Sequence, residues 1–304
     1  MLAPVESPGV VSAWGRDDPV EQDFIRNMHG PGWHVNRARM DEMLCMDARS
    51  AGAYVSSGTR VVRVIPDSRH GWSLHTRDGT HAGGEKAKVV IDASGRNRRL
   101  LFRGVPRLVD DVLVAVTIRA RGRGSGGGDL RTYVEAVPGG WWFSAPVPGD
   151  EGVAMFFTDL EDYRRIGVVL RDHLAHAPLT AARLAGAQLV ETRVLYAPSA
   201  RARQVCGPGW LAAGDAAASF DPMTGLGVLR AMEGALQAAA AADRFLDGDE
   251  SGLAEYEQWV RTGFDAYRER RRLHYSSERR WPRAGFWRRR HQQVDQETQG
   301  RSPS

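Results

Sequence analysis

The sequence contains little cysteine and has no long apolar run. Its 304 residues include only two cysteines, Cys45 and Cys206, too few for a disulfide framework or a cysteine-rich metal site. No apolar stretch of about 18 residues or more occurs, and the first residues lack the basic and apolar regions of a signal peptide. The sequence therefore predicts a cytoplasmic protein with two reduced thiols and no membrane segment.

Lysine is almost absent, since Lys86 and Lys88 are the only two and every other positively charged residue is an arginine. The 41 basic and 37 acidic residues give a formal net charge of +4, which by itself does not indicate a nucleic-acid partner. His173 and His176 have a helical spacing, but no acidic or cysteine partner completes a metal set. The sequence thus predicts neither nucleic-acid binding nor a metal site.

The remaining composition is that of a globular protein, with 42% hydrophobic and 26% charged residues. Residues 1–32 are rich in glycine, proline and charge, and they predict loop or extended structure. Apolar residues at Met40, Leu44 and Ala48 predict a helix over about residues 36–52.

Alternating or β-branched segments predict strands, and segments with helical spacing predict further helices. Strands are expected over residues 54–65, 72–76, 87–92, 112–119, 131–137, 140–147, 152–158, 191–196 and 210–213. Helices are expected over residues 160–175, 179–185, 227–246 and 253–272. This mixture predicts an α/β (α+β) protein.

The strongest chemical signal is a glycine-rich segment that joins a strand to a helix. The strand ends in Gly214 and Asp215, at the edge where α/β folds bind ligands, so the carboxylate could accept hydrogen bonds from ribitol or ribose hydroxyls. Pro222, Gly225 and Gly227 follow, and backbone N–H groups there could face a flat ligand with partial negative charge. A Gly-Asp pair alone is better explained as a plain turn, whereas the full segment indicates a ligand site.

This segment resembles that of the FAD-binding flavoprotein monooxygenases with the para-hydroxybenzoate hydroxylase fold. The helix that opens near Arg37 is similar to a family helix whose arginine lies near the cofactor, and the turn from Asp92 to Gly95 is similar to one close to the dinucleotide. Taken singly, Arg37 could be a surface ion-pairing residue, and Asp92 with Gly95 a plain turn. The resemblance implies cofactor-binding roles for Arg37, Asp92, Gly95, Gly214, Asp215, Pro222, Gly225 and Gly227.

An aromatic strand that begins at Gly140 resembles a branch containing flavin-dependent halogenases and the flavoprotein maturases of quinone-cofactor amine oxidases. The halogenase signature Gly-Trp-x-Trp-x-Ile-Pro is altered here, with Phe143 and Ala145 replacing its second Trp and its Ile. No lysine is placed to hold a hypohalous species, so the resemblance disfavours halogenation. Trp141 and Trp142 are candidate substrate-wall residues, and an aromatic strand in a half-buried sheet is an equally good interpretation.

The first part of the family fold has no counterpart in this sequence. The family begins with a strand, a Gly-x-Gly-x-x-Gly turn and a helix that seat the FAD pyrophosphate, and no such unit precedes Arg37. We therefore expect an FAD/NAD(P)-binding flavoprotein fold that lacks its first βαβ unit. Its expected parts are an FAD-binding domain at 1–110 and 195–247, an inserted antiparallel substrate sheet at 111–194, and C-terminal, arginine-rich helices at 248–304.

The resemblance implies an FAD-dependent monooxygenase that hydroxylates an aromatic acceptor, with NAD(P)H or a separate reductase as the electron source. The acceptor is either a small natural-product intermediate or a Trp or Tyr side chain of a partner protein. Few acids accompany the arginines between Arg261 and Arg290, so such a partner is expected to be acidic. No catalytic group can be named. The alternative is a truncated, non-catalytic accessory or remnant protein, and FAD retention is expected to be weak or absent.

Overall fold

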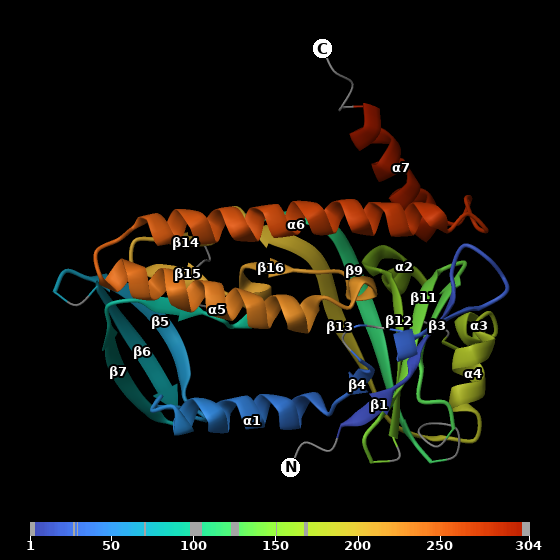
Figure 1. Cartoon of the computed structure of the whole chain (residues 1–304), viewed down its shortest axis with the longest axis horizontal. Helices are drawn as coiled ribbons and strands as arrows, with labels where there is room; N and C mark the ends of the chain where they lie inside the picture. The colour runs from blue at the N-terminus through green and yellow to red at the C-terminus, as the bar shows by residue number, and fades with distance from the viewer. Residues whose placement is uncertain are drawn as a thin grey trace. The chain divides into compact units, whose positions relative to one another are not determined.

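A computed structural model of the chain describes residues 4–26, 28, 30–69, 71–97, 105–122, 128–149, 151–166 and 170–299. The chain packs as two compact units (Figure 1). Unit 1 contains Met1–Val55, Leu113–Tyr196 and Arg272–Ser304, and unit 2 contains Ser56–Val112 and Ala197–Arg271. The long elements β9 (Arg107–Arg121), β13 (Gln188–Ala202) and α6 (Ser251–Ser277) continue from one unit into the other.

Unit 1 is built on a sheet with the strand order β13-β9-β12-β11-β10-β2-β3. Its other strands are β2 (Gly9–Ala13), β3 (Val20–Asp23), β10 (Thr132–Val137), β11 (Gly140–Val147) and β12 (Glu151–Asp159). Strands β9 to β12 pair antiparallel, whereas β2 runs parallel to β10. A separate pair joins β1 (Val5–Ser7) to β4 (Gly32–His34). The sheet is therefore antiparallel from β9 to β12 and is extended by the parallel neighbour β2.

Unit 1 also contains the helices α1 (Arg37–Ser50), α2 (Leu160–Ile166), α3 (Leu170–Leu174), α4 (Pro178–Leu184) and α7 (Gly285–Gln299), with a 3₁₀ turn η1 at Phe24–Arg26. Helix α4 packs on β10, β11 and β12, and α2 contacts β12. The helix predicted over 160–175 corresponds to α2 and α3, and residues 167–169 lie outside the described part. Trp142 and Phe156 are fully buried and lie in one core cluster with Val116.

Unit 2 combines two small sheets with two long helices. One sheet has the order β14-β15-β8, and the other has the order β5-β6-β7. Their strands are β5 (Arg60–Asp67), β6 (Gly71–Asp78), β7 (His81–Ala87), β8 (Val90–Asp92), β14 (Cys206–Gly207) and β15 (Trp210–Ala212). The short strand β16 (Ala218–Ser219) pairs with β13, and α5 (Gly227–Leu246) runs beside the unit 2 part of α6 (Figure 1).

The core of unit 2 lies between the β14-β15-β8 sheet and these two helices. Leu211 and Ala212 are fully buried against Ala238 of α5 and Tyr256 of α6. The Tyr256 hydroxyl donates a 2.6 Å hydrogen bond to the Ala212 carbonyl, so one α6 side chain holds the strand that leads into the predicted site.

The described part of residues 1–32, for which the sequence predicts loop or extended structure, contains the strands β1, β2 and β3, and β4 begins at Gly32. All four residues of β3 are exposed, and β2 pairs with β10, more than a hundred residues away in sequence. A strand held by such distant backbone hydrogen bonds leaves little local pattern. The two compact units have limits near residues 112 and 196. The domain limits expected from the sequence stay a prediction.

Candidate functional site

The site is built at the carboxyl ends of two neighbouring parallel strands, β8 and β15. Ile91 pairs with Leu211, and the Ala213 N–H donates to the Asp92 carbonyl at 2.9 Å. Each strand then enters a 3₁₀ turn, η2 (Gly95–Asn97) after β8 and η3 (Gly214–Ala216) after β15. Because parallel strands end at the same edge, the two turns face one region, and this edge is where open α/β sheets bind ligands.

Both turns begin with a glycine in the left-handed region. Gly95 has φ +73° and Gly214 has φ +57°, values that side chains with a Cβ adopt at a cost. A Cβ at Gly95 would meet no atom of a described residue within 4 Å, and one at Gly214 would lie 3.7 Å from the Ala231 Cβ. Among the described residues, backbone conformation rather than crowding therefore favours glycine at both positions.

A carboxylate and a guanidinium link the two turns. The Arg96 Nε donates to the Asp215 Oδ2 at 3.0 Å, and the two side chains are 29% and 33% exposed. Arg107 lies against the same turns, donating to the Arg96 and Asp215 carbonyls at 3.5 Å and to the Ser219 hydroxyl at 3.0 Å. The predicted ribitol-binding carboxylate is thus half-exposed and already ion-paired.

Asp92 has a buried carboxylate oxygen that no described residue satisfies. Its side chain is only 5% exposed, and its Oδ1 accepts a hydrogen bond from the Ser94 N–H at 2.9 Å. Its Oδ2 is buried and has no hydrogen-bond partner in the described part of the chain. Such an oxygen costs roughly 1–3 kcal/mol, so a ligand that donates a hydrogen bond here would stabilise the turn.

The segment before α5 forms a short 3₁₀ turn, η4 (Pro222–Thr224). The Asp221 Oδ1 accepts from the Met223 N–H at 3.0 Å, and Gly225 closes the turn with φ +63°. A Cβ at Gly225 or Gly227 would meet nothing within 4 Å, and no side chain caps the N-terminus of α5. The first N–H groups of α5 are therefore open to a negatively polarised ligand atom.

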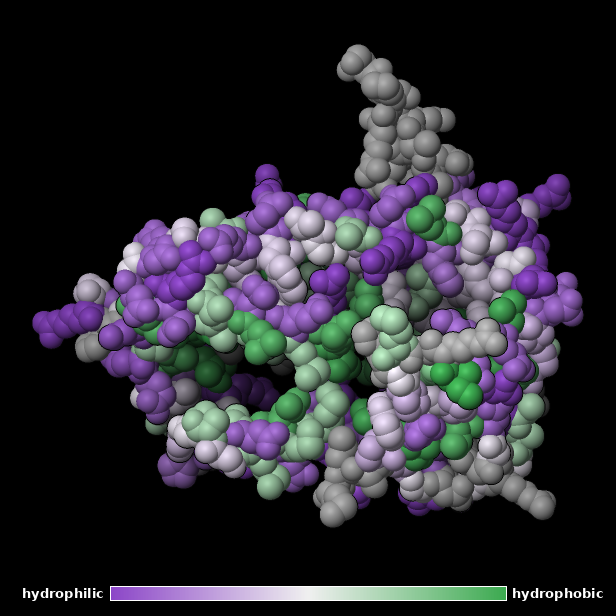
Figure 2. Space-filling view, in the orientation of Figure 1, coloured by the Kyte–Doolittle hydropathy of each residue, from purple (hydrophilic) through white to green (hydrophobic). Residues whose placement is uncertain are grey.

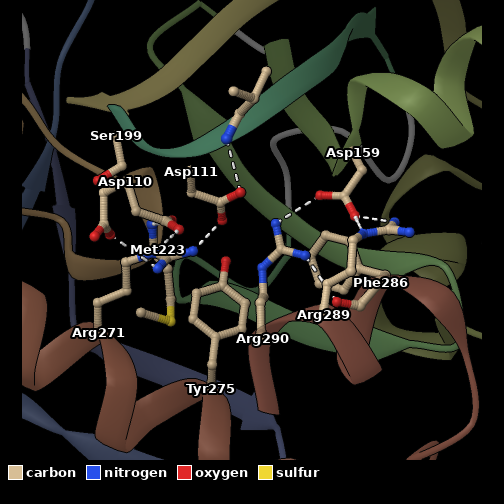
Figure 3. A network of polar contacts seen from close by, with 12 residues as sticks. Asp110, Asp111, Asp159, Ser199, Met223, Arg271, Tyr275, Phe286, Arg289 and Arg290 are labelled. Atoms are coloured by element: carbon tan, nitrogen blue, oxygen red, sulfur yellow. Dashed lines mark hydrogen bonds and ion pairs between the residues drawn. The ribbon is translucent and has the colours of Figure 1, made fainter. Parts of the chain in front are cut away.

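Side chains of α6 hold this turn in place, and Figure 3 shows Arg271 of α6 beside Met223 of the turn. Arg271 donates to Asp221 at 3.1 Å, to Asp110 at 3.2 Å and also to Asp111. The Tyr267 hydroxyl accepts the Asp221 N–H at 2.8 Å, and burial raises the pKa of Tyr267, which keeps it protonated. Asp221 is completely buried in side chain, so these contacts fix the turn that leads into α5.

A small cavity, partly open to solvent, lies between the η3 turn and the two helices of unit 2. Asp215 reaches it from the turn, and Arg230 and Trp259 line it from α5 and α6. The Arg230 guanidinium lies 5.9 Å from the centre of the Trp259 ring and 3.3 Å from Glu233. The charged groups that border this cavity are thus partnered within the protein.

Apolar side chains gather along α5 on the face shown in Figure 2. Val228, Leu229, Met232 and Leu236 are 39%, 52%, 51% and 73% exposed. A contiguous exposed apolar stripe beside a ligand edge is unusual for a surface helix. No described residue covers it, and it continues from the open N-terminus of α5.

Arg37 is the one predicted cofactor-binding residue in unit 1, whereas the others lie in unit 2. It is the first residue of α1, 61% exposed in side chain, and its Nε pairs with Asp41 at 2.8 Å. Asn36 caps the helix by accepting from the Arg39 N–H. No residue of α1 is buried, so its side chains, including Met46 at 58% exposure, are accessible.

Trp141 and Trp142 lie inside unit 1, at 1% and 0% exposure. The Trp141 Nε1 donates to the Tyr275 hydroxyl at 3.0 Å, and its ring stacks on Phe157 at 4.1 Å. The Trp142 Nε1 donates to the His173 carbonyl at 3.3 Å. A substrate could therefore touch these rings only if neighbouring side chains moved, and in the described structure both rings fill the core.

Few acids accompany the arginines near the C-terminus in sequence, but in the structure many of these arginines pair with acidic residues far away in sequence. Arg290 donates to Asp159 at 2.7 Å, and Arg289 donates to the same carboxylate (Figure 3). Arg280 pairs with Glu278 and with Asp17, at 3.1 Å from the latter. The exposed members of the group are Arg261, Arg270, Arg279, Arg283 and Arg288.

No sequence pattern indicates a role for Arg107, Tyr267 or Arg271 at the site. Arg96 could have been identified, because it directly follows Gly95 in the turn after β8. The other three act on residues from about fifty to more than a hundred positions away, which no local pattern reports. Among described residues, no group of three or more His, Cys, Asp or Glu side chains could hold a metal, and no helix is long and apolar enough to cross a membrane.

Comparison with known proteins gives one family match and several full-chain relatives. LodB of Marinomonas mediterranea, named as an FAD-dependent oxidoreductase, is 26% identical over 293 residues, covering 93% of this chain and 78% of its own. The flavin-dependent halogenase CmlS is 25% identical with a TM-score of 0.81, covering 98% of this chain. The peptidyl tryptophan dihydroxylase QhpG is 22% identical with a TM-score of 0.75, covering 95% of this chain.

The fold is therefore that of the FAD-dependent halogenases, in the α/β class. The chain spans 59% of the length of CmlS and 64% of that of QhpG. The profile of one family, described as tryptophan halogenase, matches residues 7–301. This match extends over almost the whole sequence, and the chain belongs to the tryptophan halogenase family.

Proposed function

We propose that this protein is an FAD-dependent oxidoreductase that hydroxylates an aromatic acceptor. The observation that carries the proposal is the paired turns at the carboxyl edge of β8 and β15, which present Asp92, Gly95 and Asp215 to one region. The family match and the similarity to LodB support FAD as the ligand of this edge.

The residues present fit the ribityl and ring portions of FAD. Asp215 is half-exposed and can accept hydroxyl hydrogen bonds, and the orphaned Asp92 Oδ2 can accept one more. Gly225 and Gly227 leave open space before α5, whose uncapped N–H groups suit the negatively polarised edge of a flavin ring. Arg37 is a further proposed contact, from unit 1.

If bound here, reduced FAD would supply two electrons and two protons, so that one oxygen atom of dioxygen would enter the acceptor and the other would leave as water. The protein's own contribution is to hold the ring at the α5 N-terminus, to exclude water and to orient the acceptor. The electrons are proposed to come from NAD(P)H or from a separate reductase. No described residue is assigned as a catalytic acid or base.

Hydroxylation is favoured over halogenation because no lysine lies in the sheet proposed for the acceptor, where it could hold a hypohalous species. Both lysines belong to unit 2, where Lys86 is in β7 and pairs with Asp67. The sheet proposed for the acceptor contains none. Phe143 and Ala145 also stand where the halogenase signature has Trp and Ile.

The acceptor is proposed to be an aromatic small molecule or a Trp or Tyr side chain of an acidic partner protein. Support for a protein acceptor comes from QhpG, which is named a peptidyl tryptophan dihydroxylase. The exposed arginines Arg279, Arg283 and Arg288 would favour an acidic partner.

The proposal is tested by loading the chain with FAD, reducing it and admitting air in the presence of a Trp-containing acidic peptide and chloride. We expect mass spectrometry to show a gain of oxygen on the aromatic ring. A gain of chlorine would establish halogenation instead. Free tryptophan, assayed in parallel, separates a small-molecule acceptor from a peptide acceptor.

A non-catalytic accessory or remnant protein is the second candidate. Such a protein would not retain FAD. Equilibrium dialysis at micromolar FAD separates the two functions, because only the first predicts saturable binding of one flavin per chain. The weak retention expected from the sequence would show as binding that is lost on gel filtration.

A further inference from the structure

We propose that Arg96 binds the diphosphate of FAD by exchanging its contact with Asp215 for a phosphate, which frees Asp215 for the ribityl hydroxyls. This inference rests on the proposed function, and it assigns a cofactor-binding role to a residue that neither the family resemblance nor the sequence pattern singled out.

The geometry places the two charged groups where one ligand can reach both. Arg96 extends from the η2 turn and Asp215 from the η3 turn, and these turns follow the parallel strands β8 and β15. Their side chains meet at 3.0 Å and are 29% and 33% exposed, so solvent and a ligand both have access to the pair. A flavin dinucleotide carries hydroxyls and phosphates on one continuous chain, the two group types that a carboxylate and a guanidinium recognise.

The energetics favour an exchange. A partly exposed ion pair is worth only about 0–1 kcal/mol, so little is lost when it opens. A guanidinium binds a phosphate through two parallel hydrogen bonds, and charge-assisted bonds of this kind are roughly twice as strong as neutral ones. Arg96 therefore exchanges the Asp215 carboxylate for a phosphate group, with which it can form two parallel hydrogen bonds.

The surroundings keep Arg96 near the edge during the exchange. Arg107 holds the backbone of both turns, because it donates to the Arg96 and Asp215 carbonyls and is fixed by the Ala200 carbonyl at 2.9 Å. Among the described residues, none lies within 4 Å of a Cβ placed on Gly95, so a phosphate can approach the backbone just before Arg96.

Arg96 supplies a positive charge at the edge where the ribityl chain is proposed to lie, so affinity for FAD should exceed that for riboflavin and should fall with added salt.

The test compares FAD with riboflavin, which has the same ring and ribityl chain but no phosphate. Dissociation constants are measured by flavin fluorescence for the wild type, Arg96→Gln and the control Arg261→Gln, an exposed arginine of α6 in the same unit. We expect Arg96→Gln to weaken FAD binding by about 10-fold or more, equivalent to about 1.4 kcal/mol. Riboflavin should bind no more weakly, because Asp215 is released. Inorganic pyrophosphate should displace FAD from the wild type and not from Arg96→Gln.

Each other result overturns the inference. If Arg96→Gln weakened the binding of FAD and of riboflavin equally, Arg96 would only position Asp215. If it tightened the binding of both, Arg96 would only compete with the ligand for Asp215. FAD binding that is the same in Arg96→Gln and the wild type would reject the exchange and leave the proposed function standing. Failure of the wild type to bind any flavin would reject the proposed function, and the inference with it. Thermal unfolding of each variant shows that the comparison concerns folded protein.

Discussion

Two aspartates of the same glycine-rich segment have opposite environments. Asp215 is 33% exposed and pairs with one half-exposed arginine, whereas Asp221 is fully buried and bonds both Arg271 and the Met223 N–H. Removing a partner from a buried pair leaves an uncompensated charge, and removing an exposed one does not. Variants of these two residues can therefore distinguish an effect on ligand affinity, expected for Asp215, from an effect on the free energy of unfolding, expected for Asp221.

We expect Asp215→Ala to lower the affinity for FAD several-fold with little change in thermal stability, because its hydroxyl-binding carboxylate is lost. Asp221→Ala should instead lower the free energy of unfolding by roughly 3–5 kcal/mol, since buried Arg271 loses a carboxylate. Flavin titration and urea unfolding of both variants test this. A similar loss of stability in both would contradict the assignment of Asp215 to the ligand.

Two histidines of unit 1 make its stability depend on pH. Burial lowers the pKa of His173, whose ring stacks on Phe156 at 4.4 Å, and burial also lowers the pKa of His34, which contacts the Leu130 carbonyl at 2.8 Å. The unfolded chain then binds more protons below pH of about 6.5. The free energy of unfolding should consequently fall as the pH is lowered through this region.

The variant His173→Phe keeps an aromatic ring on Phe156 but cannot take up a proton. Unfolding by urea between about pH 7.5 and 5.5 should show a flatter profile than the wild type, and adding His34→Phe should flatten it further. An unchanged slope in the double variant would show that other groups carry the pH dependence.

Among the elements, α6 connects the turn before α5 to the start of β9. Arg271 contacts Asp221 on one side and Asp110 and Asp111 on the other, and Arg268 adds a 2.6 Å bond to Asp110. The three carboxylates come from segments more than a hundred residues apart in sequence. The position of the proposed flavin-ring turn thus depends on a helix that follows it in the chain.

Arg271→Met should destabilise unit 2 by roughly 3–5 kcal/mol, because Asp110, Asp111 and buried Asp221 each lose the same guanidinium. The matched variant Arg270→Met, one position earlier and exposed, should have an effect within about 0.5 kcal/mol. Adding Asp111→Asn to Arg271→Met should recover part of the loss, since it removes one of the unpaired charges. Equal unfolding midpoints for the two single variants would show that the network does not stabilise the fold.

The sequence predicted those elements whose residues show a helical or strand periodicity within the element itself. The helix expected over 227–246 is confirmed as α5, and the helix expected over 36–52 is confirmed as α1, where Asn36 caps the first turn. The bounds of β1 to β4 lay within a region predicted only as loop or extended, because pairings such as that of β2 with β10 join segments far apart in sequence. At the site, the glycines and Asp215 were visible as a motif, whereas Tyr267 and Arg271 act on it only through the tertiary fold.

On the scale of the whole molecule, the C-terminal segment is part of unit 1. Trp287 and Phe286 are 0% and 1% exposed, the Trp287 Nε1 donates to the Val137 carbonyl at 2.8 Å, and the Trp14 ring lies 5.3 Å from it. Burying two such side chains contributes several kcal/mol. Trp14 and the aromatic residues of the C-terminal segment are thus packed into one core, so this segment is part of the fold of unit 1.

Deleting residues from Trp281 onward should therefore destabilise unit 1 and impair every activity together. Reversing exposed charges, as in Arg283→Glu with Arg288→Glu, should leave the unfolding midpoint near that of the wild type, because neither side chain is buried. If the acceptor belongs to an acidic protein, this double variant should weaken modification of that protein and remove much of its salt dependence, while oxidation of a small aromatic compound is retained. The control Arg60→Glu changes an exposed charge of unit 2. Equal modification of the acidic protein by the wild type and the double variant would exclude these arginines as its docking surface.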